Sequence, residues 1–328
     1  MPHQPLRETL HLYRGSATVQ VPLEKTAAPA IPRLVEDYLA DARARGLSPS
    51  TLTQSYGYPL RNVLAPWCEA NAITSLPELD NRALNRLSIE LLDTGGKRGP
   101  LSKHSVHTYM RAINRFLAWA EAEGEGGGAK AQLPKLPKQL VDVLARDELE
   151  RMEDAAKTER DKLIVRVLAD TGIRVGELVN LRISDLLERD RNHFIRVRGK
   201  GSRERLVPLP RLYRRLLKYA EQGRPEDVNT DRIFIALRRR PGGDYAALTT
   251  SGVDQMIRNL AKTANIRKRV YPHLLRHSYA TWALTGGMNP IQLAQILGHS
   301  SLAMIQNVYS HLSPSDAYNA MLKMLADD

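Results

Sequence analysis

Between Tyr271 and Tyr309, the sequence gathers side chains that suit phosphoryl transfer. His273 and Arg276 stand three residues apart in YPHLLRHSYAT, His299 follows a glycine, and Tyr309 lies near the end of an apolar-periodic segment. Arginine presents a planar fork of donors that matches phosphate, and histidine can donate a hydrogen bond or move a proton. A tyrosine hydroxyl can act as a covalent nucleophile when a base lies within reach. Such a site needs more than one arginine, because charge on the phosphate oxygens must be stabilised in the transition state.

Two stretches earlier in the chain supply further candidates, an arginine and a lysine. Arg174 lies in TGIRVGEL, at the turn between a buried helical pattern and a second helix, and Glu177 follows about one helical turn later. A surface ion pair between these two side chains is the alternative interpretation, and their spacing favours it as much as catalysis. Lys200 occupies the Gly-Lys-Gly tip of a β-hairpin that we expect within HFIRVRGKGSRERLVPLP. From there it can enter a DNA groove and protonate a leaving oxygen, although a solvated lysine is the commoner case.

The elements that precede these motifs have the apolar spacing of a small helical domain. Within residues 31–122, apolar side chains recur at helical intervals in four segments, which are more often core than ligand sites. Lys103, Arg111 and Arg115 lie between the apolar positions of the clearest helix. Because lysine and arginine neutralise backbone charge whatever the base sequence, we expect these three residues to contact DNA phosphates.

Composition and spacing divide the remainder of the chain. Residues 1–30 are expected to be a flexible N-terminal arm, and residues 123–139, with their glycine cluster and two prolines, a linker. Residues 140–312 combine helical patterns with the hairpin, and residues 313–328 have the period of an amphipathic C-terminal helix. The expected fold class is therefore mainly α with a small antiparallel β-sheet or hairpin, an α+β arrangement.

Further basic residues stand outside these motifs. Arg203 follows the hairpin tip, and Arg238, Arg239 and Arg240 form the start of an RRRPGGD loop. We expect these arginines to follow the DNA backbone, with a merely solvated loop as the more common alternative.

Composition restricts the class of protein. The chain of 328 residues allows roughly two domains, and its net charge of +12 favours a polyanionic partner such as nucleic acid over a basic protein without one. A single cysteine, Cys68, excludes an internal disulfide and predicts a reducing, cytosolic setting. No membrane span or signal peptide is apparent. A zinc site built from His273, His277, His299 and His311 is disfavoured, because the sequence contains no H-E-x-x-H pairing.

Four of these stretches, in their order along the chain, resemble the conserved boxes of the tyrosine recombinases, also called phage-type integrases. TGIRVGEL resembles the first-arginine box, RVRGKGSRERLVPLP the β-hairpin lysine box, HLLRHSYAT the His-x-x-Arg box, and LGHSSLAMIQNVY the closing histidine and tyrosine box. Each box alone is a weak signal, whereas four in family order are specific. The resemblance covers the second domain closely and implies that residues 31–122 are a helical core DNA-binding domain and residues 140–312 the catalytic domain.

The resemblance also implies a role for each motif residue. Tyr309 matches the nucleophile, which attacks the scissile phosphate to give a 3′-phosphotyrosyl link and a free 5′-hydroxyl. Lys200 matches the general acid for the leaving oxygen, and His273 matches the base for the tyrosine. Arg174 and Arg276 match the two arginines that clamp the non-bridging oxygens.

The last two motif positions have supporting roles in the family. His299 matches the second histidine or tryptophan, which orients the phosphate, and Glu177 matches an acidic position that supports the site. No metal or other cofactor is expected, because the arginines stand in for a divalent ion.

The implied function is site-specific recombination, or integration, of DNA from a mobile genetic element, exchanging strands between two DNA sites without ATP or metal. The partners implied are double-stranded recombination sites, other copies of the chain in a tetramer on synapsed DNA, and accessory DNA-bending or directionality proteins. The free protein is expected to be a monomer, in the cytoplasm of a prokaryotic cell and associated with its nucleoid. A relaxing enzyme similar to type IB topoisomerases and a non-cleaving DNA-binding protein are the alternatives.

Overall fold

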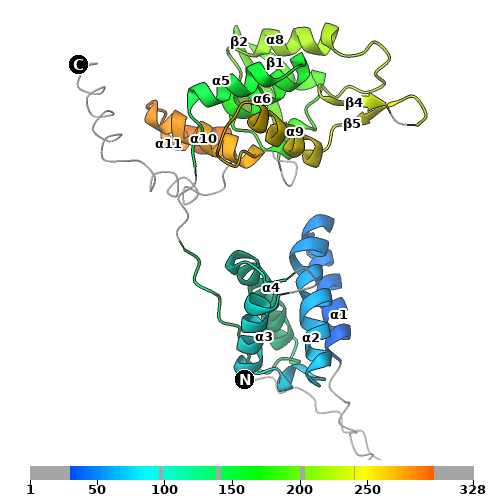
Figure 1. Cartoon of the computed structure of the whole chain (residues 1–328). Coiled ribbons are helices and arrows are strands. Elements are labelled where there is room, and N and C mark those ends of the chain that lie inside the picture. Colours follow the sequence, from blue (N-terminus) through cyan, green and yellow to red (C-terminus); the bar gives the residue numbers. More distant parts are fainter. Residues whose placement is uncertain (1–29, 96–98, 138–141, 200–203, 240, 299–328) are drawn as a thin grey trace, which may run out of the picture. The chain divides into compact units, whose positions relative to one another are not determined.

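The computed structural model describes residues 30–95, 99–137, 142–199, 204–239 and 241–298 (Figure 1). The chain divides into two compact units, Met1–Lys138 and Gln139–Asp328. Helices dominate both units, and the strands β1 to β5 of the second unit pair as small antiparallel sheets. The predicted fold class is therefore confirmed. No helix among the described residues combines the length and the apolar character needed to cross a bilayer.

The first unit is a bundle of amphipathic helices around one apolar core. Asp80 and Ser102 cap two of these helices by accepting a hydrogen bond from a backbone N–H in the first turn. The ring of Tyr38 packs 5.7 Å from that of Phe116, which joins the first helix to the last. The elements are α1 (Ile31–Ala44), π-helical segments at Thr51–Gly57 and Leu60–Leu64, α2 (Ala65–Ala70), a 3₁₀ turn at Leu76–Glu78, α3 (Asn81–Asp93) and α4 (Lys103–Ala122).

The segment after α4, which is predicted to be a linker over residues 123–139, packs in part on the helical unit. Ala131 is only 3% exposed and packs on the core of the helical unit. The Asn114 side chain on α4 holds it by two hydrogen bonds, accepting from the Ala131 N–H at 2.7 Å and donating to the Ala131 carbonyl at 2.9 Å. The first part of this segment is therefore attached to the helical unit, because a small apolar residue and an amide with both a donor and an acceptor meet there.

The second unit surrounds a core in which α6 is buried on most of its surface. Leu163, Ile164, Val167 and Leu168 of α6 are all fully buried, and the helix packs against both α5 and α10. The helices are α5 (Arg146–Ala155), α6 (Glu159–Thr171), α7 (Val175–Leu178), α8 (Tyr213–Lys218), α9 (Thr250–Thr263), α10 (Pro272–Thr285) and α11 (Pro290–Leu297), with a 3₁₀ turn at Ile183–Asp185 and a π-helical segment at Tyr219–Gly223.

Two antiparallel sheets complete the second unit. β1 (Leu186–Arg189), β2 (Asn192–Arg198) and β3 (Glu204–Pro208) form one sheet, and β4 (Ile235–Arg239) and β5 (Tyr245–Ala247) form the other. The predicted hairpin is β2–β3, in which Arg198 pairs with Glu204 at the last described register position. Lys200 and Arg203 lie between these two residues, outside the described part of the chain.

Two glycines in left-handed backbone conformations shape the turns that border the candidate site. Gly172 ends α6 at φ +63°, and a Cβ built on it would meet the Tyr279 ring at 2.4 Å. Gly298 ends α11 at φ +65°, and a Cβ there would lie 3.0 Å from the guanidinium of Arg205. Glycine is favoured at both positions because other residues are strained at these dihedral angles and would also crowd their neighbours.

Candidate active site

A cleft of about 1110 Å³ in the second unit brings together four of the predicted site residues, Arg174, Glu177, His273 and Arg276. Arg174 and Glu177 lie at the N-cap and in the first turn of α7, and His273 and Arg276 lie in the first two turns of α10, about a hundred residues later in the sequence. Gly199 and Gly298 also line the cleft, and they directly precede Lys200 and His299 in the chain. Lys200, His299 and Tyr309 themselves lie outside the described residues.

Arg276 is held rigidly in the wall of the cleft. It is 4% exposed, its Nη1 donates to the Gly172 carbonyl at 2.7 Å and its Nη2 donates to the Leu297 carbonyl at 2.8 Å. Burial, together with the positive charge of Arg174, lowers the pKa of Arg276 to about 10. The guanidinium therefore stays charged at neutral pH, and its plane is fixed before any anion arrives.

Arg174 is the N-cap residue of α7 and is more accessible, with 44% of its side chain exposed. Its Nη1 lies 3.2 Å from the Glu177 Oε1, and its Nη2 donates to the Gly298 carbonyl at 3.4 Å. The ion pair with Glu177 that the spacing predicted is therefore present. The same side chain also lines the cleft beside Arg276, so the pairing orients this arginine toward the site and the two interpretations are compatible.

Glu177 is a buried carboxylate, 7% exposed, that binds two arginines. Besides the contact with Arg174 Nη1, Glu177 accepts a hydrogen bond from the Arg174 backbone N–H at 2.8 Å. It also accepts a bidentate pair of hydrogen bonds from Arg205, one to each carboxylate oxygen, both at 2.8 Å. Burial by itself raises the pKa of Glu177, but the hydrogen bonds from Arg205 and from the Arg174 N–H outweigh it and the net pKa is lowered. The side chain is therefore ionised at neutral pH.

His273 and Arg276 lie one helical turn apart on α10, so both face the cleft. His273 is exposed to solvent. Partial burial and the positive charges of Arg276 and Arg174 lower the pKa of His273 from 6.5. The imidazole is therefore neutral at pH 7, the form that can accept a proton.

Two further residues, which the sequence did not indicate, support this site: Arg205 lines the cleft, and Asp185 binds Arg198 of the cleft wall. Arg205, on β3, is 13% exposed and binds Glu177 through both terminal nitrogens. Asp185 is 1% exposed and accepts hydrogen bonds from Arg196 Nε at 3.1 Å and Arg198 Nη1 at 3.0 Å on β2. For Arg205, strand alternation could have indicated an inward-facing side chain, because it places Arg205 on the same face as buried Val207.

Two of the predicted DNA contacts share a groove on the helical unit. Arg111 and Arg115 of α4 line a hollow of about 240 Å³ whose other walls carry hydroxyl groups. Arg115 Nη1 donates to the Tyr56 hydroxyl at 3.0 Å, and Lys103 is exposed at the start of the same helix. Arginines beside hydroxyl donors suit phosphate oxygens. The hydroxyl-bearing residues of the groove are Thr51, Ser55, Tyr56 and Thr108.

The predicted arginine loop is only partly described. Arg238 is exposed at the end of β4. Arg239 forms an ion pair with Asp227 and donates to the Gly243 carbonyl at 2.8 Å, so its charge is engaged within the protein. Arg240 lies outside the described residues.

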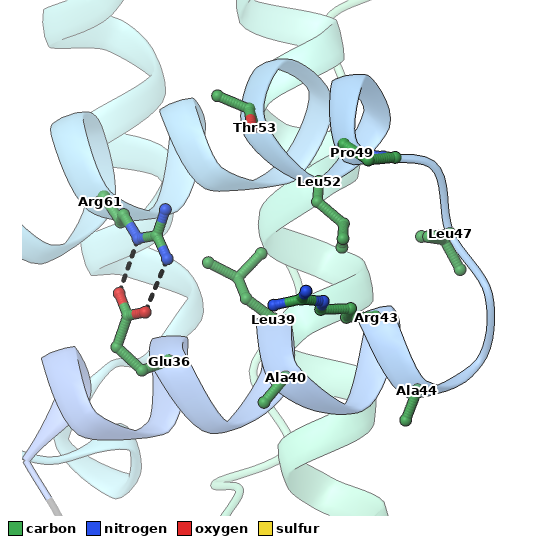
Figure 2. A pocket seen from close by; sticks show the side chains of 10 residues that line it. All are labelled: Glu36, Leu39, Ala40, Arg43, Ala44, Leu47, Pro49, Leu52, Thr53 and Arg61. Atoms are coloured by element: carbon green, nitrogen blue, oxygen red, sulfur yellow. Dashed lines mark hydrogen bonds and ion pairs between the residues drawn. The ribbon is translucent and has the colours of Figure 1, made fainter.

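A larger hollow of the helical unit, about 930 Å³, contains none of the candidate residues (Figure 2). It lies beside α1, and Arg61 Nε and Nη2 each donate to a Glu36 carboxylate oxygen at 2.6 Å along its wall. Because Arg61 and Glu36 neutralise each other, neither of them is available for chemistry in this hollow. Among the described residues, no group of three His, Cys, Asp or Glu side chains is placed to hold a metal ion.

The chain is similar to known proteins over most of its length. The phage integrase family matches residues 142–316. Tyrosine recombinase XerD of Oceanobacillus iheyensis is 30% identical over 293 residues, which cover 85% of this chain and 93% of the relative. Tyrosine recombinase XerA of Saccharolobus solfataricus is 31% identical over 253 residues, 74% of this chain and 78% of the relative.

Solved structures show the same fold. The XerH site-specific recombinase bound to its difH substrate, in a pre-cleavage complex, superposes with a TM-score of 0.63 at 23% identity, covering 87% of this chain and 83% of that one. Lambda integrase residues 75–356 bound to DNA superpose with a TM-score of 0.62 at 17% identity, covering 83% of this chain and 93% of that one.

Proposed function

This chain belongs to the phage integrase family, the tyrosine recombinases, and from that membership we propose how its own residues cleave and rejoin DNA. The protein is a tyrosine-type site-specific recombinase that acts on DNA, as the sequence motifs predicted. The assignment of steps to residues rests on one observation. Arg174, His273 and Arg276 line one cleft, together with the residues that directly precede Lys200 and His299.

In the proposed cleavage step, the Tyr309 hydroxyl attacks the scissile phosphate. The bond from phosphorus to the 5′-oxygen breaks, a 3′-phosphotyrosyl bond forms, and Lys200 protonates the leaving oxygen. His273 accepts the proton from Tyr309, which its neutral state allows. Attack by a 5′-hydroxyl of a second strand reverses these steps, and because one phosphodiester replaces another, no ATP is required.

We assign the stabilisation of the phosphate to Arg174 and Arg276. Arg276 is fixed by the carbonyls of Gly172 and Leu297, and Arg174 is oriented by Glu177 and the Gly298 carbonyl. Charge developing on the non-bridging oxygens therefore meets donors that are already in place. His299, which follows Gly298, is assigned a hydrogen bond to the same phosphate. Glu177 supports the site by holding Arg174.

We propose that residues 31–122 grip the DNA as a core-binding domain and residues 140–312 carry the chemistry. Arg111 and Arg115 provide the phosphate contacts of the first domain, since they share a groove with hydroxyl donors. Lys103, Arg203, Arg238 and Arg240 remain expected backbone contacts.

We further propose that four protomers act together on two synapsed DNA sites. A tetramer of lambda integrase, a structural neighbour, has been solved on a Holliday junction. Residues 313–328, which lie outside the described part of the chain, are proposed to contact the neighbouring protomer. We also propose that the free protein is a monomer in the cytoplasm, associated with the nucleoid. Accessory DNA-bending or directionality proteins are its further proposed partners.

Covalent trapping tests the proposed chemistry. Wild type, Tyr309→Phe and Tyr245→Phe would be incubated with labelled, nicked suicide duplexes from the DNA flanking the gene and separated on denaturing gels. Tyr245 lies on β5, away from the cleft, and serves as the matched tyrosine control. We expect an adduct with wild type and Tyr245→Phe, and DNA binding without an adduct for Tyr309→Phe.

Either of two results would contradict the proposal. An adduct with Tyr309→Phe would show that the nucleophile is another residue. DNA binding by wild type without any adduct would favour the non-cleaving alternative.

A further inference from the structure

Arg205 connects three parts of the cleft wall that are distant in the sequence. It lies on β3, paired with Val197 of β2. Both of its terminal nitrogens donate to the Glu177 carboxylate at 2.8 Å, and its Nε donates to the Ile296 carbonyl at 2.6 Å. Arg205 lines the cleft, but only 13% of its side chain is exposed and all three of its guanidinium nitrogens donate to groups of the protein.

Arg205 is linked to Arg174 through the Glu177 carboxylate, which both arginines bind. Glu177 accepts the Arg174 backbone N–H at 2.8 Å and lies 3.2 Å from Arg174 Nη1. It therefore sets both the start of α7 and the direction of the Arg174 guanidinium. Because a planar guanidinium binding both oxygens fixes the plane of a carboxylate, Arg205 determines the orientation in which Glu177 presents itself to Arg174.

Arg205 is also linked to Arg276, through the last turn of α11. Ile296 is followed by Leu297, whose carbonyl accepts from Arg276 Nη2 at 2.8 Å, and by Gly298, whose carbonyl accepts from Arg174 Nη2 at 3.4 Å. The last turn of α11 is thus held by three arginines at three successive carbonyls. A shift of this turn would move the partners of Arg174 and Arg276 together.

The site needs such an arrangement because its cations repel one another. Arg174 and Arg276 line the same cleft, and the positive charge of Arg174 disfavours the charged form of Arg276. Glu177 and the carbonyls of the α11 turn counter this repulsion. Arg205 binds both of these groups, as Arg174 does. Because the charge of Arg205 itself also disfavours the charged form of Arg276, its contribution is to hold these groups in place.

We propose that Arg205 is a positioning residue of the recombinase site, which sets the relative placement of the Arg174 and Arg276 guanidinium groups by holding Glu177 and the last turn of α11. This inference rests on the proposed function for its catalytic consequence. Its geometric content, the placement of the two arginines, can be measured without DNA cleavage.

Arg205→Lys is the informative variant, because it keeps the charge and removes the fork. Arg215→Lys is the matched control. Arg215, on α8, also binds two carboxylates, donating to the partly buried Glu153 at 2.6 Å and to the exposed Glu159 at 2.5 Å and 3.1 Å, but it does not line the cleft. Thermal unfolding of both variants would show that each folds.

The first readout is the NMR titration of His273 in the protein without DNA. The nearby charge of Arg174 contributes to the low pKa of His273. If Arg174 loses its placement in Arg205→Lys, the pKa of His273 rises although the charge at position 205 is unchanged. The same titration in Arg215→Lys should match wild type.

The second readout is the single-turnover rate of adduct formation on a suicide duplex, together with DNA affinity. Misplacement of a reacting group by about 1 Å can cost about 100-fold in rate, and we expect a loss of that order for Arg205→Lys with unchanged DNA affinity. Wild-type values of both the His273 pKa and the rate in Arg205→Lys would overturn the inference, as would equal losses in Arg215→Lys. If wild type forms no adduct but Arg205→Lys raises the pKa of His273, the proposed function fails and the positioning role of Arg205 stands.

Discussion

Replacing Glu177 with glutamine should destabilise the second unit more than the loss of an exposed ion pair would. The substitution keeps the shape of the side chain but replaces one carboxylate oxygen with an NH₂ group. That group would face the donors of Arg205 or the Arg174 N–H, which now approach the carboxylate at 2.8 Å. At least one donor would therefore lose its acceptor, and the charge of Arg205 would lose its counter-ion.

The exposures of the partners set the size of this effect. Breaking a buried ion pair by removing one partner costs about 3–5 kcal/mol. Glu177 and Arg205 have side chains 6% and 13% exposed, so neither is readily rehydrated, whereas Arg174, at 44%, can turn to water. We therefore expect the lower end of the range, about 3 kcal/mol. For a unit of about 150–250 residues, this lowers the melting temperature by roughly 6–12 °C.

Differential scanning calorimetry of the full chain at neutral pH measures this change. Glu204→Gln is the matched control, because Glu204 pairs with Arg198 at 3.0 Å with 48% of its side chain exposed and its loss should cost under about 1 kcal/mol. Because the pKa of Glu177 is lowered from 4.5 by its hydrogen bonds despite burial, its stabilisation is present above pH 4.5 and disappears as the pH falls through the lowered pKa. The difference between wild type and Glu177→Gln should shrink accordingly in acid. Equal melting temperatures for Glu177→Gln and wild type at pH 7 would refute the reasoning.

Three further predictions concern the chemistry and the DNA contacts. Arg174→Lys should lose most adduct formation, because an ammonium cannot reproduce the planar fork, and near-normal trapping on suicide duplexes would exclude the clamp role. In the DNA-free protein, an NMR titration of His273 should give a midpoint below 6.5, because burial and the charges of Arg276 and Arg174 disfavour the imidazolium; a midpoint at or above 6.5 would contradict its placement in the cleft. Replacing both Arg111 and Arg115 with alanine should weaken DNA binding for all sequences and reduce the slope of log affinity against log salt by about 2. An unchanged slope in gel-shift titrations would remove these residues from the interface.

Local patterns were sufficient for much of the candidate site. The i, i+3 spacing of His273 and Arg276 predicts that both face one side of a helix, and they do lie on one face of α10. The same reasoning anticipated the Arg174–Glu177 pair. It did not reveal that Glu177 is buried, because the few residues around GEL do not indicate how deeply a short helix is packed. The sequence likewise did not indicate that Ala131 of the predicted linker packs on the helical unit, since its anchor, Asn114, lies on another element.

The order and types of the motif residues, which are properties of the sequence by itself, determined the family, the fold class and the enzymatic activity of this protein. Only the tertiary structure decided what holds the site together. Arg276 is fixed by the carbonyls of Gly172 and Leu297, and Arg205 by Glu177 and Ile296. Backbone carbonyls carry no residue-specific signal, and partners separated by as many as 104 residues become neighbours only when the helices and the hairpin pack around a common core. Periodicity describes which face a side chain occupies within one element, whereas the group it meets on another element depends on the packing of the whole unit.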